Sequence, residues 1–155
     1  MAQEIERKFL VSGDGWKAGV ESSARLQQGY LSTSAKATVR VRIYDDREAV
    51  LTLKGKPEGL ARAEFEYPLP LEDARELMEI AQPNVIEKRR HNVPHGAHMW
   101  EVDVFEGHHQ GLIMAEVEMS SVDEDVVLPP WVGREVSDDD RYANASLSRN
   151  PGVPD

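Results

Sequence analysis

The chain contains no cysteine among its 155 residues, so disulfide bonds, zinc–thiolate centres and cysteine nucleophiles are excluded. It also lacks any apolar run approaching the roughly 20 residues that cross a membrane as a helix. Residues 1–11 lack the apolar centre of a signal peptide. These absences favour the cytoplasm as the compartment, and we expect no membrane partner.

Basic residues are the minority among the charged side chains. Lysine and arginine number 18 against 28 aspartates and glutamates, which gives a formal net charge of -10. Nucleic acids and anionic membranes are polyanions, so general binding to either is disfavoured, although a local basic pocket is compatible with this balance. We therefore predict no nucleic-acid partner.

The composition is that of a globular protein, with 40% hydrophobic and 30% charged residues. A chain of this length can bury one core but is too short for two ordinary domains. We predict a single domain over residues 1–155, with a loose tail from about residue 150.

Charged side chains alternate with other residues in the N-terminal stretch Glu4-Ile5-Glu6-Arg7-Lys8. In a β-strand, Glu4, Glu6 and Lys8 share one face. Like charges on one face repel each other, and a metal ion or an ionic ligand between them would relieve that repulsion. The stretch therefore indicates a strand with a functional face.

The same alternation recurs along the chain. It predicts eight strands, at residues 4–11, 26–32, 37–44, 48–54, 61–68, 85–93, 98–105 and 112–120. Gly29 in the second strand is expected to mark a bulge or a close approach. Helical spacing predicts one long helix over 71–82, ended by Pro83, with a short helical piece after Val122 and a last helix near 140–149. Eight antiparallel strands can close a barrel, so we predict an all-β-dominated α+β fold: an eight-stranded antiparallel closed β-barrel, or tunnel, with a few flanking helices.

The charged faces of these strands collect eight acids and seven bases, nearly balanced in a chain of net charge -10. If these faces converge, the barrel interior is a charged tunnel and the apolar faces point outward. Helices or a partner subunit would then cover the apolar faces, which makes a homodimer a hypothesis. The acids are Glu4, Glu6, Glu64, Glu66, Glu101, Asp103, Glu116 and Glu118, and the bases are Lys8, Arg40, Arg42, Lys54, Arg62, Lys88 and Arg90.

This mixture of charges indicates a chemistry. Carboxylate pairs at i, i+2 suit Mg²⁺ or Mn²⁺, which prefer oxygen ligands. The bases suit phosphate oxygens, and arginine can donate two hydrogen bonds to them. Together they predict a site for a metal-chelated polyphosphate attacked in line by water. The alternative for each pair taken alone is the solvated face of a strand, with ion pairs worth under about 1 kcal/mol.

The histidines, the tryptophans and one acidic run are not part of the alternating charged faces. The histidines lack ligand spacing and are predicted at the surface, and the tryptophans are predicted to pack on the outer sheet face. Asp138 to Asp140, before Arg141, are interpreted as a helix N-terminus. The histidines are His91, His95, His98, His108 and His109, and the tryptophans are Trp16, Trp100 and Trp131.

Several short motifs follow one another along the chain. They are Glu-Ile-Glu-Arg-Lys-Phe at 4–9, Gln28-Gly29-Tyr30-Leu31, Arg40-Val41-Arg42, Leu53-Lys54-Gly55, Arg62-Ala63-Glu64-Phe65-Glu66, Glu87-Lys88-Arg89-Arg90, Glu101-Val102-Asp103, Glu116-Val117-Glu118 and Arg141-Tyr142-Ala143-Asn144. In this order they resemble the CYTH, or triphosphate tunnel metalloenzyme, superfamily over roughly residues 2 to 148. One E-x-E-x-K motif is a weak signal, but the ordered set is a strong one.

The resemblance implies an eight-stranded tunnel and metal-dependent hydrolysis or transfer at a triphosphate, with Mg²⁺ or Mn²⁺ and two ions during turnover. It implies Lys8, Tyr30 and Lys88 as catalytic residues, with a hydrogen-bonded Lys8–Tyr30 pair and Lys88 assisting activation of water. The family's C-terminal helix plugs or borders the tunnel, so Arg141 is expected to face into it. The implied metal ligands are Glu4, Glu6, Glu116 and Glu118, with Glu64, Glu66, Glu101 and Asp103 as weaker candidates. The implied phosphate-binding residues are Lys8, Arg40, Arg42, Lys54, Arg62, Lys88 and Arg90.

Among members of the superfamily, the chain is most similar to the short bacterial type, which resembles inorganic triphosphatases. The first hypothesis is therefore divalent-metal-dependent hydrolysis of inorganic triphosphate, with this small molecule as the partner. The alternatives are a class IV-type adenylyl cyclase or a thiamine triphosphatase on the same tunnel. A protein that binds triphosphate or polyphosphate without cleaving it is a third hypothesis.

Overall fold

A computed structural model describes residues 3–34 and 36–154 of the chain. No helix in these residues is long and apolar enough to span a membrane. The strands are β1 (Gln3–Val11), β2 (Ser22–Thr33), β3 (Ala37–Tyr44), β4 (Glu48–Gly55), β5 (Ala61–Leu69), β6 (Val85–His95), β7 (His98–Glu106), β8 (Ile113–Glu118) and β9 (Val132–Glu135). The α-helices are α1 (Leu71–Ala81) and α2 (Asn144–Arg149), and the 3₁₀-helices are η1 (Gly15–Gly19), η2 (Gly107–His109) and η3 (Asp140–Tyr142).

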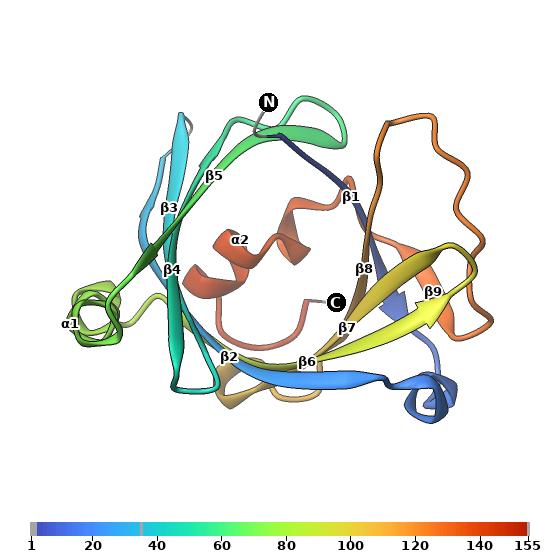
Figure 1. The fold of residues 1–155 in the computed structure, drawn as a ribbon, viewed down its shortest axis with the longest axis horizontal. Coiled ribbons are helices and arrows are strands. Elements are labelled where there is room, and N and C mark those ends of the chain that lie inside the picture. The colour runs from blue at the N-terminus through green and yellow to red at the C-terminus, as the bar shows by residue number, and fades with distance from the viewer. Residues whose placement is uncertain (1–2, 35, 155) are drawn as a thin grey trace.

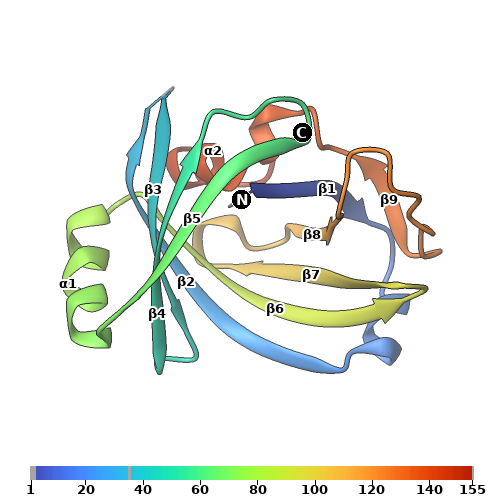
Figure 2. The same ribbon diagram turned by 45° about the horizontal axis from the view of Figure 1, so that its top comes forward.

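Eight of the strands close into an antiparallel barrel, which confirms the predicted fold class (Figure 1). Their order around the ring is β5-β4-β3-β2-β6-β7-β8-β1. The ring closes where the first residues of β1 pair with β5, from Gln3 opposite Ala63 to Ile5 opposite Ala61. The unpredicted strand β9 pairs with the far half of β1 (Figure 2).

The segment between β8 and β9 differs from its prediction. The short helical piece expected after Val122 is wrong, because residues 122–131 contain turns and irregular chain but no helix. The Glu124 side chain instead accepts a hydrogen bond from the Ser120 backbone N–H at 3.0 Å, which closes a local turn. Pro129 and Pro130 also lack the N–H groups that a helix needs.

An apolar shell lies on the outside of the barrel, as predicted. Because side chains alternate between the faces of a strand, β1 and β7 turn Phe9 and Trp100 outward while their carboxylates turn inward. Trp16 of η1 and Trp131 pack onto the same buried cluster. The Phe9 and Trp100 rings lie 5.5 Å apart between centroids, and the Trp100 and Trp131 rings 5.8 Å. All three tryptophans are therefore packing groups of the outer sheet face.

Helix α1 covers another part of the outer face, over β2, β3 and β4 (Figure 1). Gly29 on β2 allows this helix to approach closely. A Cβ placed on Gly29 would lie 2.8 Å from both Ala81 Cβ and Met78 Sδ, which confirms the predicted close approach. Ala74 of α1 is buried in the same layer, where its partners on the barrel are Val41, Ile43 and Ala49.

We expect Gly29→Ala to lower the free energy of unfolding by about 1–3 kcal/mol, because the added methyl group must push α1 away from the barrel. Urea unfolding followed by tryptophan fluorescence measures this change. Gly15→Ala is the matched control, because its Cβ would find its nearest neighbour, on Trp131, at 3.8 Å. Equal losses in the two variants would contradict a close approach at Gly29.

The C-terminal segment lies inside the ring of strands in Figure 1 and fills one end of the barrel. We call residues 140–149 the C-terminal plug. Tyr142 and Leu147 of the plug pack in a buried cluster with apolar residues of β2, β6, β7 and β8. The predicted last helix is confirmed as η3 and α2. Asp139 caps η3 by accepting from the Arg141 backbone N–H at 3.2 Å, and the exposed Arg141 side chain also donates to Asp139 instead of lining the barrel interior.

His109 is buried, so its predicted surface position is wrong. Its Nε2 donates to the carbonyl oxygens of Leu147 at 2.6 Å and Asn150 at 3.2 Å. The tail from Asn150 forms neither helix nor strand over residues 150–154, and Gly152 N–H donates to the His108 carbonyl at 2.8 Å. The turn at η2 therefore anchors the plug and the tail. The spacing of the histidines in the sequence does not reveal that the His109 imidazole binds these backbone carbonyls.

Candidate active site

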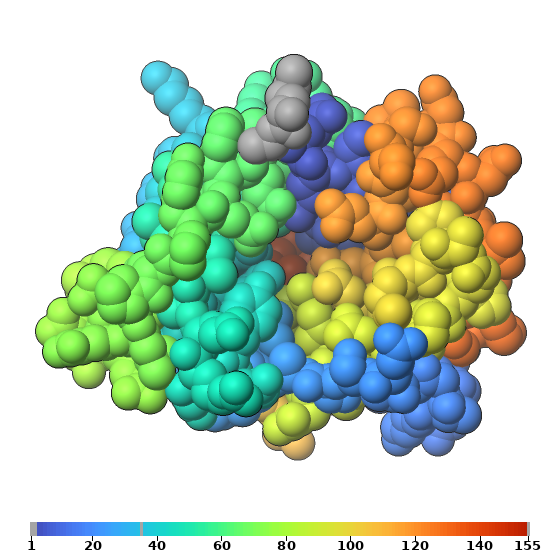
Figure 3. All heavy atoms as spheres, in the orientation of Figure 1, coloured from blue at the N-terminus to red at the C-terminus, as the bar shows by residue number. Residues whose placement is uncertain are grey.

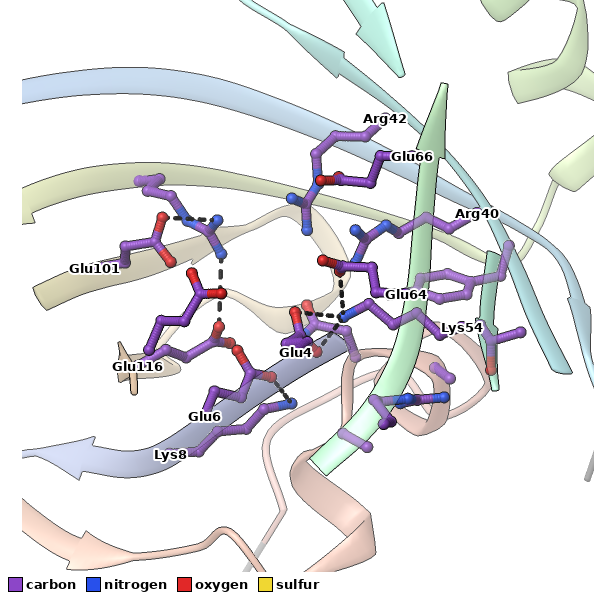
Figure 4. A pocket seen from close by; sticks show the side chains of 18 of the residues that line it. Glu4, Glu6, Lys8, Arg40, Arg42, Lys54, Glu64, Glu66, Glu101 and Glu116 are labelled. Atoms are coloured by element: carbon purple, nitrogen blue, oxygen red, sulfur yellow. Dashed lines mark hydrogen bonds and ion pairs between the residues drawn. The ribbon is translucent and has the colours of Figure 1, made fainter. Parts of the chain in front are cut away.

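The charged strand faces converge on one cavity of about 220 Å³ inside the barrel (Figure 4). All eight barrel strands contribute to its lining, and the plug contributes residues 143–145. In Figure 3, the strands leave a central hollow in the face shown, and the dark red C-terminal segment is visible at its bottom. Thirteen of the fifteen predicted charged residues line the cavity, together with Tyr30, and the other two, Lys88 and Asp103, lie behind the lining.

Lys54 on β4 joins two carboxylates across the cavity. Its Nζ donates to both oxygens of Glu4, at 2.9 and 3.1 Å, and lies 3.5 Å from Glu64 Oε2. Burial would raise the pKa of Glu4, but Lys54 outweighs burial and the pKa is lowered. Burial and the charge of Glu4 raise the pKa of Glu64 to about 7. One cation thus serves two carboxylates, and Glu64 remains short of positive charge.

Glu6 and Glu118 lie directly opposite each other in the β1–β8 pair, where like charges destabilise a sheet. Burial and the charge of Glu116 raise the pKa of Glu6 to about 8, although Lys8 Nζ is 3.7 Å from Glu6 Oε1. Burial, followed by the charge of Glu4, also raises the pKa of Glu118. The neighbouring lysines therefore do not outweigh the effects of burial and of the other acids on the pKa of this pair.

Glu116 has the opposite electrostatic environment. Burial alone would raise its pKa, but Lys8 and Arg90 together lower it to about 2. Arg90 lies 3.8 Å from Glu116 and 3.2 Å from Glu101, and burial nevertheless raises the pKa of Glu101. The acids of the cavity are thus of two kinds: those whose pKa neighbouring cations lower, such as Glu116, and those whose pKa burial raises despite a cation nearby, such as Glu6 and Glu101.

Arg40 and Arg42 on β3 present two buried guanidinium groups to the same cavity. The Nε atom of each is buried without a hydrogen-bond partner among the described residues. Arg40 Nη2 donates to Thr52 Oγ1 at 3.4 Å, Thr52 donates to Glu66 at 3.4 Å, and Arg42 Nη1 donates to Tyr44 Oη at 3.1 Å. Burial, followed by the charge of Arg40, lowers the pKa of Arg42. Crowded cations with unused donors are suited to binding an anion.

Two other predicted residues line the cavity with their polar groups already in use. Arg62 donates from Nε and Nη2 to the Gly55 carbonyl at 3.0 and 2.8 Å, which ties β5 to the end of β4. Tyr30 Oη accepts a hydrogen bond from Gln28 Nε2 at 3.4 Å. Burial opposes protonation of Lys8, but Glu6 and the other neighbouring acids outweigh it and its pKa is raised. The hydrogen-bonded Lys8–Tyr30 pair stays a prediction.

Behind the lining, Lys88 and Asp103 form a fully buried ion pair, with Nζ 2.7 Å from Oδ2. Arg90 donates to both Asp103 oxygens, at 2.8 and 2.9 Å. Burial would raise the pKa of Asp103, but Arg90 and Lys88 hold it well below its usual range. Burial lowers the pKa of Lys88 to about 7 against the attraction of Asp103. The pair therefore supports Arg90 from behind, and direct contact of Lys88 with phosphate or water stays a prediction.

Asn144 is a cavity residue that charge alternation misses. It is the first residue of α2, and its Oδ1 accepts hydrogen bonds from Lys88 Nζ at 3.0 Å and Gln28 Nε2 at 3.3 Å. Its side chain is neutral and comes from a short helix. Its one signal in the sequence is membership of the motif at 141–144, which has no strand alternation to suggest a role.

The carboxylates of the cavity fit a divalent cation by their chemistry. Across residues 3–34 and 36–154, no group of three acidic or histidine side chains is already gathered to hold a metal ion. Lys54 and Lys8 lie against Glu4 and Glu6 and occupy the oxygens that a cation would use. Burial and neighbouring acids raise the pKa values of Glu6 and Glu118, and a divalent cation beside them would favour their ionised forms.

Comparisons with known proteins agree with this geometry. The CYTH domain matches residues 2–148 of the chain. An inorganic triphosphatase of Acetivibrio thermocellus is 42% identical over 154 residues, covering 97% of this chain and 96% of that protein. An inorganic triphosphatase of Nitrosomonas europaea is 36% identical over 150 residues, covering 94% and 96%. The crystal structure of the inorganic triphosphatase NE1496 is similar with a TM-score of 0.66 and 34% identity, covering 94% of this chain and 97% of that one. The chain therefore belongs to the CYTH domain family.

Proposed function

We propose that the protein hydrolyses inorganic triphosphate, a phosphoanhydride, with the help of Mg²⁺ or Mn²⁺. The proposal rests on one observation: a single cavity holds carboxylates crowded by burial and by neighbouring acids, together with buried arginines that have unused donors. A complex of a divalent cation with a chain of phosphates satisfies both sets. The two similar proteins named inorganic triphosphatase support this choice.

The polarity of the cavity favours bare triphosphate over ATP or thiamine triphosphate. Seven of its lining residues are acids and six are bases, and a second cavity of about 320 Å³ that adjoins it shares Glu4, Glu6, Lys8 and Arg62. Among the described lining residues, only Tyr30 and Tyr44 carry aromatic rings, and Tyr44 Oη is engaged by Arg42. An organic ring attached to the triphosphate would therefore find few apolar contacts.

The buried guanidinium groups of Arg40 and Arg42 are the strongest phosphate ligands that we propose. Arg90 is held by Asp103 in a fixed orientation and would bind a second part of the phosphate chain. Lys8, which its neighbours keep protonated, would donate to phosphate oxygens beside Tyr30. Lys54 and Arg62 would join them after exchanging their present partners, Glu4 and the Gly55 carbonyl.

Glu6 and Glu118 are the metal ligands that we propose first, with Glu4 and Glu116 beside them. Asp103 is poorly suited, because it is fully buried and already accepts from Arg90 and Lys88. Glu64, Glu66 and Glu101 line the cavity and would serve a second ion. When bound, such ions polarise phosphoryl oxygens and lower the pKa of coordinated water.

A substrate panel tests the proposed function. Phosphate release from triphosphate, ATP, thiamine triphosphate and pyrophosphate is measured with Mg²⁺ and with Mn²⁺, and kcat/KM is compared. We expect triphosphate to give the highest value and a chelator to abolish turnover. A higher value for ATP or thiamine triphosphate would favour the corresponding alternative enzyme. Tight binding of triphosphate without turnover under either ion would favour a binding protein.

We also propose a cytoplasmic homodimer. The outer face of β4 and β5 exposes Leu53, Phe65 and Tyr67, which no helix covers among the described residues and which a second copy would bury. Sedimentation equilibrium tests the association.

A further inference from the structure

Asn144 occupies the point where the plug meets the cavity, and two buried donors hold its side-chain amide. Lys88 Nζ donates to Oδ1 at 3.0 Å and Gln28 Nε2 donates to the same oxygen at 3.3 Å. An ammonium group can only donate hydrogen bonds, so the amide atom facing Lys88 must be the oxygen. Lys88 is itself fixed by Asp103 at 2.7 Å. Buried residues on the side away from the cavity, Lys88 and Gln28, therefore fix the orientation of the Asn144 amide.

This orientation leaves the Nδ2 group of Asn144 with both its hydrogens available. In the described part of the chain, Nδ2 donates to no protein group, although Asn144 lines the cavity. The oxygen is turned toward Lys88 and Gln28, which are fully buried, so the amide hydrogens are the polar part left on the cavity side. A neutral double donor at this position can bind an anion without drawing a carboxylate toward it.

We propose that Asn144 is a substrate-binding residue, whose Nδ2 donates to a phosphate oxygen at the end of the cavity closed by the plug. The inference rests on the proposed function and names a contact within that site. It gives the buried Lys88–Asp103 pair a role as well, because Lys88 fixes the amide that touches substrate. Lys88 is in this respect a positioning residue that acts through Asn144.

Asn144→Asp separates substrate binding from attachment of the plug. The carboxylate still accepts from Lys88 and Gln28, so the plug stays attached and the thermal unfolding midpoint is expected to be unchanged or higher. The donor to phosphate is replaced by a negatively charged acceptor, and a hydrogen bond to a charged group is worth roughly tenfold or more in affinity. We therefore expect the KM for triphosphate to rise at least about tenfold, with a smaller change in kcat.

Asn150→Asp is the matched control. This asparagine follows α2, is exposed, and donates from Nδ2 to the Ser146 carbonyl at 2.8 Å, away from the cavity. The same change of charge there is expected to leave both KM and kcat as in the wild type. A large rise in KM in this variant as well would show that added negative charge, and not the lost donor, explains the effect.

A direct readout on the wild-type protein does not depend on turnover or on the folding of a variant. In a ¹⁵N-labelled sample with chelator, inorganic triphosphate is expected to shift the side-chain amide resonances of Asn144 and not those of Asn150. Lys88→Met, which removes one anchor of Oδ1, is expected to reduce that shift. Wild-type turnover of triphosphate with no shift at Asn144 and an unchanged KM in Asn144→Asp would overturn this inference and leave the proposed function standing. Absence of turnover in the wild type would instead overturn the proposed function.

Discussion

Replacing Glu6 with glutamine is expected to lower metal-dependent hydrolysis of triphosphate by more than about 100-fold, since losing a residue that merely orients a metal ligand already costs about 10–100-fold. The amide keeps the shape of the side chain but cannot supply a charged oxygen to a cation. The fold should not suffer, because the glutamine that replaces Glu6 opposite Glu118 cannot ionise and so cannot place a second negative charge there. Activity and stability are thus expected to move in different directions.

The stability of the metal-free protein should depend on pH through this residue. Burial and Glu116 raise the pKa of Glu6 to about 8 from an ordinary value of 4.5, so the folded protein holds the proton more tightly than the unfolded chain does. The resulting stabilisation is complete below the unfolded pKa and is lost as the pH rises through the folded one. With chelator, the wild type is therefore expected to be less stable at about pH 9 than at about pH 6, and Glu6→Gln to show a smaller decline.

Phosphate release with Mg²⁺ or Mn²⁺ and thermal unfolding with chelator at the two pH values check both parts. Glu48→Gln is the matched control, because Glu48 is an exposed acid at the start of β4, outside the cavity lining. It should leave both quantities unchanged. Unaltered turnover in Glu6→Gln would remove Glu6 from the metal site, and an unaltered pH dependence would contradict its crowded environment.

Asp103→Asn is expected to lower the free energy of unfolding by about 3–5 kcal/mol, the range for breaking a buried ion pair by removing one partner. Asp103 accepts from Lys88 at 2.7 Å and from Arg90 at 2.8 and 2.9 Å, and it is fully buried. Without its charge, two cations remain in the wall of the barrel. Lys88 can release its proton, since burial already lowers its pKa to about 7, but the arginine cannot.

Urea unfolding of two further variants isolates the effect of burial. Asp139→Asn makes the same change in a carboxylate that also contacts two arginines, Arg134 and Arg141, but at the surface, and we expect unfolding to be unchanged. The double variant Asp103→Asn/Lys88→Met should recover part of the lost stability, because it removes one uncompensated cation. Strict additivity of the two substitutions would contradict the coupling between Lys88 and Asp103.

The barrel and most of its lining could be predicted because side chains alternate between the two faces of a strand, so the sequence of each strand indicates which residues face the cavity. Glu4, Glu6 and Lys8 alternate with apolar or outward residues in steps of two, and the structure places all three in the cavity. Alternation reports which side a residue faces but not how deep it lies. Lys88 and Asp103 follow the same pattern as Arg90 and Glu101, yet they are sealed behind the lining by the plug and by each other.

The features that were missed depend on contacts between distant parts of the chain. Strand β9 has only four residues and exists because β1 offers an edge beyond its pairing with β5. The position of His109 is determined by the carbonyls of Leu147 and Asn150, about forty residues later in the sequence. Asn144 enters the cavity only because the plug folds back into the ring. No local periodicity carries this information.

The barrel has charged side chains inside and apolar side chains outside. The alignment of its strands must therefore place both sets of residues correctly at once. Phe9, Trp100 and Val117 hold the outer shell from the same strands whose alternate residues, such as Lys8 and Glu116, line the cavity. Inserting or deleting a single residue within a strand would exchange the two faces beyond that point. Charges would enter the tryptophan cluster while apolar groups replaced the ligands of the cavity. Changes in chain length are therefore expected to be tolerated in the loops and not in the strands, whereas single substitutions in the ionic lining are expected to leave the outer shell intact.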